Sequence, residues 1–226
     1  MSENKPLTFN ETVRGIAEFI EVAIHTILFV RQVYPADVFV RRKKYETPVY
    51  QSRHPALNEY ISGAVKAVRD EMELGKVEKV IVAIRDQNQV ALERFIFSID
   101  HMVQVEAFDK DACVENAMTP SNLVQYFRSF LIKINMIESV LGQLELADDI
   151  NFSVIIELKD DTVPTASQAK EQPPWVPAEL QNTTSGTTDD AEMHMLRAVN
   201  TGIVNLSVAV QESGEKLQRM KDSMAP

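Results

Sequence analysis

The chain has 226 residues, 45% of them hydrophobic and 25% charged, which is enough to bury the core of one domain. Its formal net charge of −10 excludes nonspecific binding to nucleic acid or to anionic membranes as the main activity, because both need an excess of lysine and arginine. The single cysteine, Cys113, excludes an intramolecular disulfide and a cysteine-cluster zinc site. Residues 1–6 are polar and carry no secretory signal, so we expect a reducing intracellular compartment.

The first apolar stretch predicts a helix that is capped by Asn10 or Thr12 and runs to Val33, with apolar residues at spacings of three and four. Pro35 ends it, because the residue before a proline is pushed out of the helical region. Charged residues interrupt the stretch, so it lacks the roughly 20 consecutive apolar residues of a transmembrane span. His25 lies on its polar flank and is interpreted as a surface or hydrogen-bonded histidine rather than a metal ligand.

Residues 37–40 form a short strand candidate that leads into the basic run Arg41–Lys44. This run has two interpretations: a phosphate contact or nuclear-import signal, or one solvated arm of a hairpin. The acidity of the whole chain favours the hairpin arm. A further helix is expected over Ala56–Leu74, with Gly75 just past its end.

The next stretches predict the centre of an antiparallel sheet. Val77–Arg85 is a β-branched run of strand length, which indicates a buried strand. After a polar turn, Phe95, Phe97 and Ile99 occupy alternate positions, as expected for its antiparallel partner. Another short strand is expected over Gln104–Phe108.

We expect the chain to be organised around one long helix over Thr119–Gly142. Thr119 is the expected cap, Pro120 the first helical residue and Gly142 the left-handed stop. Such a helix would be roughly 33 Å long, the width of a small domain. Ile132 and Met136 fall on its otherwise polar face, which indicates either a partner surface or ordinary exposed apolar residues.

The last third of the chain changes character. Asn151–Leu158 alternates as a strand does, whereas residues 160–190 are polar and turn-rich and carry the single tryptophan, Trp175. Strand character returns at Met193–Val210, so this terminal segment must cross the domain and dock on an existing sheet edge. Glu212–Pro226 is expected to be a charged, frayed end.

The sequence contains no motif of catalysis. The seven glycines form no phosphate-binding cluster, and the four histidines have no pair at metal-ligand spacing. Neighbouring aspartates on a strand point to opposite faces, so the adjacent pairs are poor candidates for cooperating carboxylates. Cys113 with a distant histidine is a nucleophile candidate without a local motif. We therefore expect no enzyme, no cofactor and no metal, and the residues alone indicate an α+β domain that binds a partner.

Several segments, in this order, resemble the HORMA domain family. They are Glu18–His25, Tyr34 and Pro35, Arg42–Tyr45, Pro48 and Val49, His54 and Pro55, Leu57, Asn58 and Tyr60, Val77–Val80, Arg128–Ile134, and Pro174 and Trp175. Together they cover roughly residues 13–210. They look most similar to the mitotic-arrest-deficient-like subclass that serves as the accessory, non-catalytic subunit of DNA polymerase zeta.

The resemblance implies an α+β fold: a HORMA-like three-layer domain whose helices pack on an antiparallel sheet, with the long helix at the centre. It also implies a mobile C-terminal safety belt that wraps over a bound peptide and pairs again with the sheet edge, so that exchange is slow. We expect a flexible N-terminus over 1–11, a HORMA core over 12–158, a safety belt over 159–211 within the same domain, and a flexible tail over 212–226.

The function implied is a non-enzymatic adaptor of translesion polymerase zeta in the nucleus, with the cytoplasm as a second location. It would clasp a proline-containing peptide of the catalytic subunit and bridge it to other translesion or repair factors. The peptide site carried over from the family consists of Tyr34, Pro35, Tyr60 and Trp175. For Tyr60 the alternative is simple core packing. A checkpoint-type adaptor in spindle or DNA-repair signalling is the alternative function.

The resemblance implies two further surfaces. A HORMA homodimer or heterodimer would use Arg128, Ile132, Lys133, Met136 and Ser139. The C-terminal domain of a Y-family translesion polymerase would dock near Met193, Leu196, Ser207 and Ala209. Here the chain departs from the family, because Ala209 and Ser207 replace a tyrosine and a glutamine. An AAA+ remodelling ATPase is a further implied partner, whereas direct binding to nucleic acid or a membrane is not expected.

Overall fold

The computed structural model describes residues 5–103, 109–144, 150–160, 162–165 and 175–224, so the strand expected at Gln104–Phe108 lies outside the described residues. The helices are α1 (Phe9–Val30), α2 (Pro55–Glu73), α3 (Pro120–Asn135), α4 (Glu138–Leu141) and α5 (Gly214–Met224), with short 3₁₀ turns at Ala36–Val38 and Leu180–Asn182. The strands are β1 (Phe39–Lys44), β2 (Thr47–Ser52), β3 (Val77–Arg85), β4 (Ala91–His101), β5 (Asn151–Leu158), β6 (Glu192–Asn200) and β7 (Val204–Glu212).

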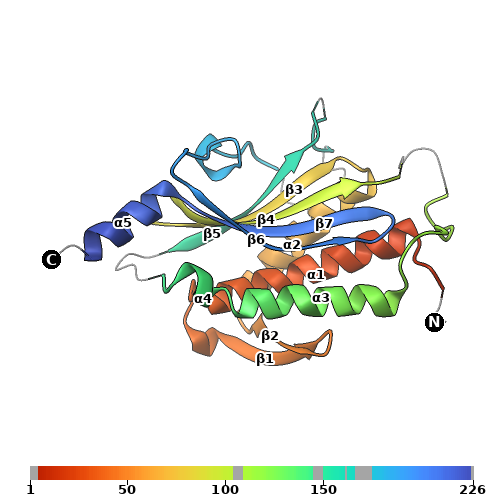
Figure 1. The fold of residues 1–226 in the computed structure, drawn as a ribbon, viewed down its shortest axis with the longest axis horizontal. Coiled ribbons are helices and arrows are strands. Elements are labelled where there is room, and N and C mark those ends of the chain that lie inside the picture. Colours follow the sequence, from red (N-terminus) through yellow and green to blue (C-terminus); the bar gives the residue numbers. More distant parts are fainter. Residues whose placement is uncertain (1–4, 104–108, 145–149, 161, 166–174, 225–226) are drawn as a thin grey trace.

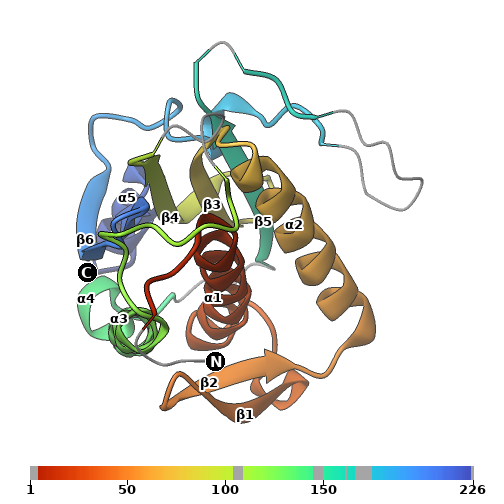
Figure 2. The same cartoon turned by 90° about the vertical axis from the view of Figure 1, so that its right-hand side faces the viewer.

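The elements form three layers, as expected for the α+β class. Figure 2 shows α1 end-on between α2 and α3, with the five-stranded sheet on one side of this helical layer and the β1–β2 hairpin on the other. The core joins the apolar faces of all three helices to the inner face of the sheet. Strands β3 and β4, at the middle of the sheet, confirm the two strands predicted from alternation and β-branching.

The helix at the centre of the domain is α1, and the prediction that Thr119–Gly142 takes this place was wrong. Helix α1 is buried on most of its circumference, because it contacts α2, α3, the hairpin and the sheet, whereas α3 buries one face and lies at the flank (Figures 1 and 2). The cap of α1 is Thr8, not Asn10 or Thr12. Thr8 and Glu11 form a reciprocal capping box, which satisfies two backbone N–H groups at once.

The predicted long helix is in fact two helices. Its start at Thr119 is confirmed, since the hydroxyl accepts the N–H of Asn122. Helix α3 ends at Asn135, whose side-chain amide donates back to the carbonyl of Leu131 at 2.9 Å and so competes with continued helix. The chain resumes as α4 and stops at Gly142, which has φ of +69° as predicted.

The sheet has the order β5-β3-β4-β7-β6 and is antiparallel throughout. The expectation that the terminal segment docks on an existing sheet edge is confirmed, because β7 pairs with β4 along its whole length. Met193–Val210, where strand character was expected, is a hairpin of two strands, β6 and β7. Gly202 makes the turn with φ of +82°, and a Cβ there would lie 2.2 Å from the carbonyl oxygen of Asn116. Only glycine fits this close approach.

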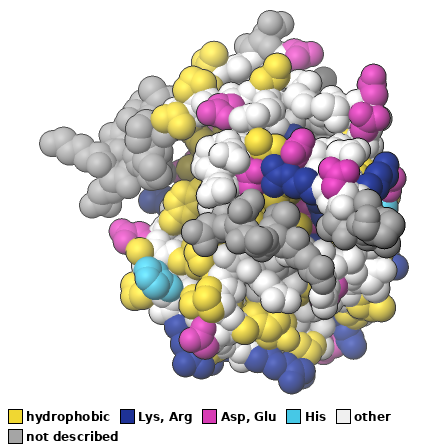
Figure 3. All heavy atoms as spheres, turned by 90° about the vertical axis from the view of Figure 1, so that its left-hand side faces the viewer, with side chains coloured by type: hydrophobic (Ala, Val, Ile, Leu, Met, Phe, Trp, Pro, Cys, Tyr) yellow, Lys and Arg dark blue, Asp and Glu magenta, His cyan; other side chains and the backbone are white. Residues whose placement is uncertain are grey.

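The basic run Arg41–Lys44 forms most of β1 and pairs with β2. Arg41, Arg42 and Lys43 are exposed, and Figure 3 shows lysine and arginine side chains gathered at the bottom of the molecule, where the hairpin lies. Lys44 forms an ion pair with Glu18 of α1. The run is thus a solvated hairpin arm, as its alternative interpretation predicted.

The C-terminus is not the frayed end expected over Glu212–Pro226. Helix α5 follows β7 directly and places Lys216, 2% exposed, in a buried cluster of charges. Its ammonium donates to Glu93 Oε1 at 2.7 Å and to Glu212 of β7. Arg31, at the end of α1, donates to both oxygens of the same Glu93 at 2.7 and 2.9 Å. These ion pairs hold α5 against β4, β7 and α1. The spacing of charged residues in the sequence does not show that these side chains meet.

Two histidines in the core make folding sensitive to acid. Burial lowers the pKa of His25 to about 4 and that of His101 to about 4, the latter helped by the nearby Lys159 charge. The unfolded pKa is about 6.5, so between pH 6.5 and 4 the unfolded state binds protons that the folded state does not. The free energy of unfolding should therefore fall by about 2 kcal/mol per histidine from pH 7 to 4.5. Urea titrations check this, and His25→Gln should flatten the dependence; an unchanged slope contradicts it.

Candidate functional site

A groove of about 660 Å³ lies between β5 and α2. Strand β5 is the last strand of the sheet and pairs with β3 alone, so its other side is a free edge within the described residues. Figure 2 shows α2 beside this edge. The groove is lined by α2, by β5 and by the segment that follows it, including Tyr60, Ala64, Ala67, Ser153, Val154, Ile156, Trp175, Val176 and Asn182.

Tyr60 projects from α2 into the groove and is 45% exposed, so the core-packing alternative does not describe it. Its ring packs edge-on against Phe152 at 5.5 Å, and its oxygen accepts the backbone N–H of Val154 at 3.3 Å. The second contact shows that the backbone of β5 offers hydrogen-bonding groups on its free side. An extended chain entering here would find a strand to pair with.

Trp175 lies across the groove from α2, on the segment that crosses from β5 toward β6. It is half-buried and packs against the edge of the main core, with the exposed Val176 next to it. The structure therefore brings Tyr60 and Trp175 to one groove, as predicted. Two aromatic faces in such a groove suit a proline ring, which loses little entropy on binding.

The other two predicted peptide residues lie outside the groove lining. Tyr34 packs edge-on against Phe152 at 6.2 Å, one ring away from Tyr60. Burial and the neighbouring Tyr60 raise the pKa of Tyr34. Pro35 is exposed and begins the 3₁₀ turn before β1. Tyr34 therefore reaches the aromatic wall of the groove through Phe152, whereas Pro35 stays outside the lining.

Sequence reasoning missed the backbone edge of β5 and the small residues Ala64 and Ala67 of α2, which keep the groove open. The Ser153 hydroxyl is buried there and has no hydrogen-bond partner among the described residues. Alternation predicts that Asn151–Leu158 is a strand, but it does not tell which strand ends the sheet. Only the pairing of all five strands shows that.

The segment between β5 and β6 is tied down on both sides of the groove. Glu71 of α2, 3% exposed, accepts the backbone N–H of Thr165 at 2.6 Å. On the outer sheet face, Glu157 accepts the N–H and hydroxyl of Thr184, and it forms an ion pair with Lys79 at 2.9 Å. Burial opposes ionisation of Glu157, but the hydrogen bonds from Thr184 and Lys79 outweigh it, and its pKa falls below the ordinary value.

Glu157→Gln should loosen this anchor. The variant loses the charged acceptor of Thr184, at a cost of about 1.5 kcal/mol, so the Thr184 amide should exchange its hydrogen roughly tenfold faster. Hydrogen-exchange mass spectrometry of residues 179–190 measures the rate. Glu78→Gln is the matched control, because Glu78 contacts the same Lys79 but not Thr184. Equal exchange in the two variants would contradict the anchor.

The residues predicted for dimer formation lie on one exposed strip formed by α3, the α3–α4 connection and α4: Arg128, Ile132, Lys133, Met136 and Ser139. Ile132 and Met136 are 41% and 59% exposed, and Val140, which the prediction missed, extends the strip. Arg128 donates to Glu46 of the β1–β2 turn at 3.2 Å. Dimer formation through this strip stays a prediction.

The four residues predicted to bind a Y-family polymerase domain do not all lie on one face of the sheet. Met193, Ser207 and Ala209 share the outer sheet face. Ser207 and Ala209 pair with Ser98 and Ile96 of β4, and Met193 pairs with Gln211, which lies on the same face of β7 as Ser207 and Ala209. Leu196, at a bulge in β6, packs instead against the main core. Ala209 is buried between neighbouring strands, so Met193 is the member that a partner can reach most readily. This contact also stays a prediction.

One group of metal-ligating side chains comes together among the described residues: Glu192, His194 and Glu212, on β6 and β7. His194 lies 3.0 Å from Glu212, whose other oxygen already accepts from Lys216. The group is therefore held by its own contacts, the His194–Glu212 contact and the Lys216–Glu212 ion pair. No helix among the described residues is both long and apolar enough to cross a membrane.

A free sheet edge, a flanking helix and a crossing segment anchored on both sides define a domain that can clasp an extended chain. The chain belongs to the HORMA domain family, whose model matches residues 13–204. Both the fold class and the family expected from the sequence are thereby confirmed.

Two relatives and two solved structures are similar over most of the chain. The mitotic spindle assembly checkpoint protein MAD2B of Gallus gallus is 30% identical over 213 residues, which cover 93% of this chain and 95% of that protein. The DNA polymerase zeta processivity subunit of Schizosaccharomyces pombe is 35% identical over 145 residues, covering 63% and 67%. A chain of the mitotic checkpoint complex crystal structure has a TM-score of 0.68 at 22% identity, covering 89% and 98%. C. elegans HTP-2 bound to the HIM-3 closure motif has a TM-score of 0.67 at 9% identity, covering 91% of each chain. These two structures show the common fold.

Proposed function

We propose that this chain is a non-enzymatic adaptor, the regulatory subunit of a translesion DNA polymerase zeta. It holds a proline-containing peptide of the catalytic subunit between β5, α2 and the segment that carries Trp175. The observation that carries the proposal is the convergence of Tyr60 and Trp175 on one groove at the free edge of β5. The relatives named as polymerase zeta processivity subunits support it.

The peptide adds a strand to β5, so that its backbone supplies affinity and its proline supplies specificity. The chain acts in the nucleus and links the catalytic subunit to further factors. The exposed strip on α3 and α4 binds a second HORMA domain, the outer face near Met193 contacts a Y-family polymerase, and an AAA+ ATPase resets the belt. Each of these partners is a separate part of the proposal.

A checkpoint-type adaptor is the second candidate, and it is supported by the relatives named mitotic spindle assembly checkpoint protein. Affinity purification of the tagged chain from its own cells, beside a Tyr60→Ala/Trp175→Ala variant, separates the two. We expect a B-family polymerase catalytic subunit with the wild type and its loss with the variant. Spindle or checkpoint proteins in its place favour the second candidate, and partners retained equally by the variant overturn the aromatic site.

Direct DNA binding through Arg41–Lys44 would behave in the opposite way to peptide binding in the Tyr60–Trp175 groove. Its affinity would fall steeply with salt and would not depend on Trp175. Binding of the peptide should instead show modest salt dependence. Repeating the purification at two salt concentrations therefore distinguishes the two modes.

A further inference from the structure

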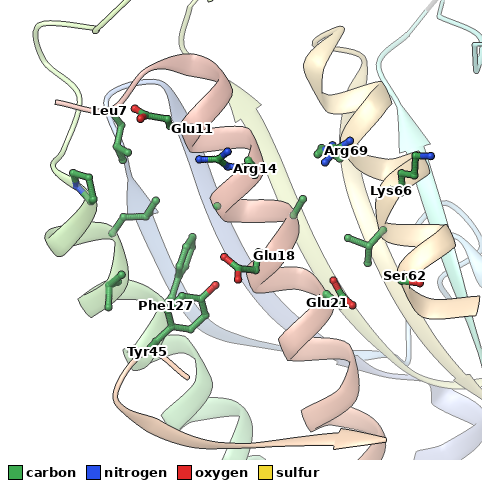
Figure 4. A pocket seen from close by; sticks show the side chains of 16 residues that line it. Leu7, Glu11, Arg14, Glu18, Glu21, Tyr45, Ser62, Lys66, Arg69 and Phe127 are labelled. Carbon is green, nitrogen blue, oxygen red and sulfur yellow. The ribbon is translucent and has the colours of Figure 1, made fainter. Parts of the chain in front are cut away.

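A second groove, of about 840 Å³, lies over the exposed stripe of α1, between α2 and the start of α3 (Figure 4). Its floor is apolar and includes Ala17, Val65, Leu123 and Phe127, all buried. It shares no lining residue with the groove of Tyr60 and Trp175, because α2 contributes a different face to each. The two grooves can therefore be occupied at the same time.

Figure 4 shows Arg14 of α1 and Lys66 and Arg69 of α2 toward one end of this second groove, and Glu18 and Glu21 of α1 toward the other. Glu11 also lies at the end with Arg14, but its carboxylate accepts the N–H of Thr8 in the capping box of α1. Arg14, Lys66 and Glu21 form no hydrogen bond or ion pair with the part of the chain that the structure describes. Glu18 is already paired with Lys44 of β1, so Glu21 is the carboxylate that remains for a partner at the acidic end.

The acidic end has the features of a site for one cation. Burial, together with the neighbouring Glu18 carboxylate, raises the pKa of Glu21, so a positive charge placed there would be favourable. The Tyr45 hydroxyl is buried beside them, and burial together with the Glu18 carboxylate raises its pKa. The rings of Tyr45 and Phe127 lie 5.2 Å apart and form an aromatic wall. Lys44 already pairs with Glu18 and lies 5.3 Å over the Tyr45 ring, so a guanidinium that enters here would donate to Glu21.

We propose that this groove docks an extended segment of a partner protein that carries an arginine for Glu21 and an acidic residue for Arg14 and Lys66. Arg14 and Glu21 are seven residues apart on α1, a rise of roughly 10 Å. In an extended chain every second side chain points to the same face, so residues four positions apart, roughly 13 Å, are the nearest pair that shares a face and spans this distance. The partner segment therefore has its arginine and its acidic residue four positions apart, with an apolar side chain midway between them that rests on the floor.

Charge complementarity selects this partner over nucleic acid. A phosphate backbone would meet Arg14 and Lys66 favourably, but it would also meet two carboxylates at the other end of the groove. A single segment with one charge of each sign satisfies both ends. The docking is independent of the proposed peptide clasp, because none of the residues involved lines the other groove.

A peptide array tests the proposal directly with the full chain. The peptides carry one arginine and one glutamate separated by one to five residues, in both orders, with leucine at the intervening positions. We expect labelled wild-type protein to bind most strongly to the peptides with three intervening residues, in which both charges share a face. The strongest peptide is then titrated by fluorescence anisotropy against wild type, Glu21→Arg and Glu59→Arg. Glu59 is exposed on α2 and outside the groove, so it matches the change of charge.

Glu21→Arg should weaken binding at least tenfold, and a peptide with glutamate in place of arginine should recover most of that loss. Glu59→Arg and Tyr60→Ala/Trp175→Ala should bind as wild type does, which separates this site from the proposed clasp. Absence of saturable binding, no dependence on spacing, or equal affinity of the Glu21 and Glu59 variants would overturn the proposal. Equally strong binding of duplex DNA that Glu21→Arg enhances would also overturn it.

Discussion

Arg31→Met is expected to lower the free energy of unfolding by about 3–5 kcal/mol, the range for breaking a buried ion pair by removing one partner. Arg31 and Glu93 are 2% and 0% exposed, and the substitution removes both hydrogen bonds from the guanidinium to Glu93. Lys216 alone would then have to neutralise Glu93 and Glu212. Urea unfolding followed by circular dichroism at pH 7 measures the loss.

Two further variants test whether the loss of stability in Arg31→Met comes from the buried charge. Arg128→Met breaks the exposed pair with Glu46, so it should cost less than about 1 kcal/mol. The double variant Arg31→Met/Glu93→Leu leaves the balanced pair of Lys216 and Glu212, so it should be more stable than Arg31→Met alone. A double variant that is less stable than the single one would show that packing around Arg31, not its charge, carries the effect.

Removal of either aromatic side chain of the β5 groove should weaken binding of a proline-containing peptide about 100-fold, the size expected of an aromatic anchor at the centre of an interface. Tyr60→Phe should bind nearly as wild type does, since the ring remains and only the acceptor for the Val154 N–H is lost. Fluorescence anisotropy with a labelled peptide from a polymerase catalytic subunit measures the affinities.

Tyr126→Ala is the control for this series, because Tyr126 lies on α3 and outside the groove. It should leave the peptide affinity within about twofold of wild type. Circular dichroism of each variant checks that the fold is kept. Loss of binding in Tyr126→Ala as well would point to a general change of the domain and would count against the aromatic site.

Strands were predictable where a short stretch of sequence shows side-chain alternation or a run of β-branched residues, as in Val77–Arg85 and Asn151–Leu158. The central helix was not, because the apolar periods of α1 and α3 look alike and only packing on both sides of α1 distinguishes them. Helix α5 was missed because a lysine near the end of a chain is normally solvent-exposed. Only the folded structure shows that Lys216 is buried beside Glu93.

The candidate site, like the fold, was only partly predictable from local sequence patterns. Tyr60 and Trp175 are far apart in the sequence, and no periodicity links them, so their pairing came from the resemblance to the HORMA family. The free edge of β5 depends on which strands lie next to β3, a choice made by long-range pairing. The anchors at Glu71 and Glu157 likewise depend on where the crossing segment comes to rest.

The crossing segment has far more reach than its path requires. Strands β5 and β6 lie at opposite edges of the five-stranded sheet, roughly 20 Å apart at the usual strand spacing. The chain between Leu158 and Glu192 could extend roughly 100 Å. We expect this extra length to let the segment pass over peptides of different width while the β6–β7 hairpin keeps its register. Selection among peptides would then depend on the walls of the groove.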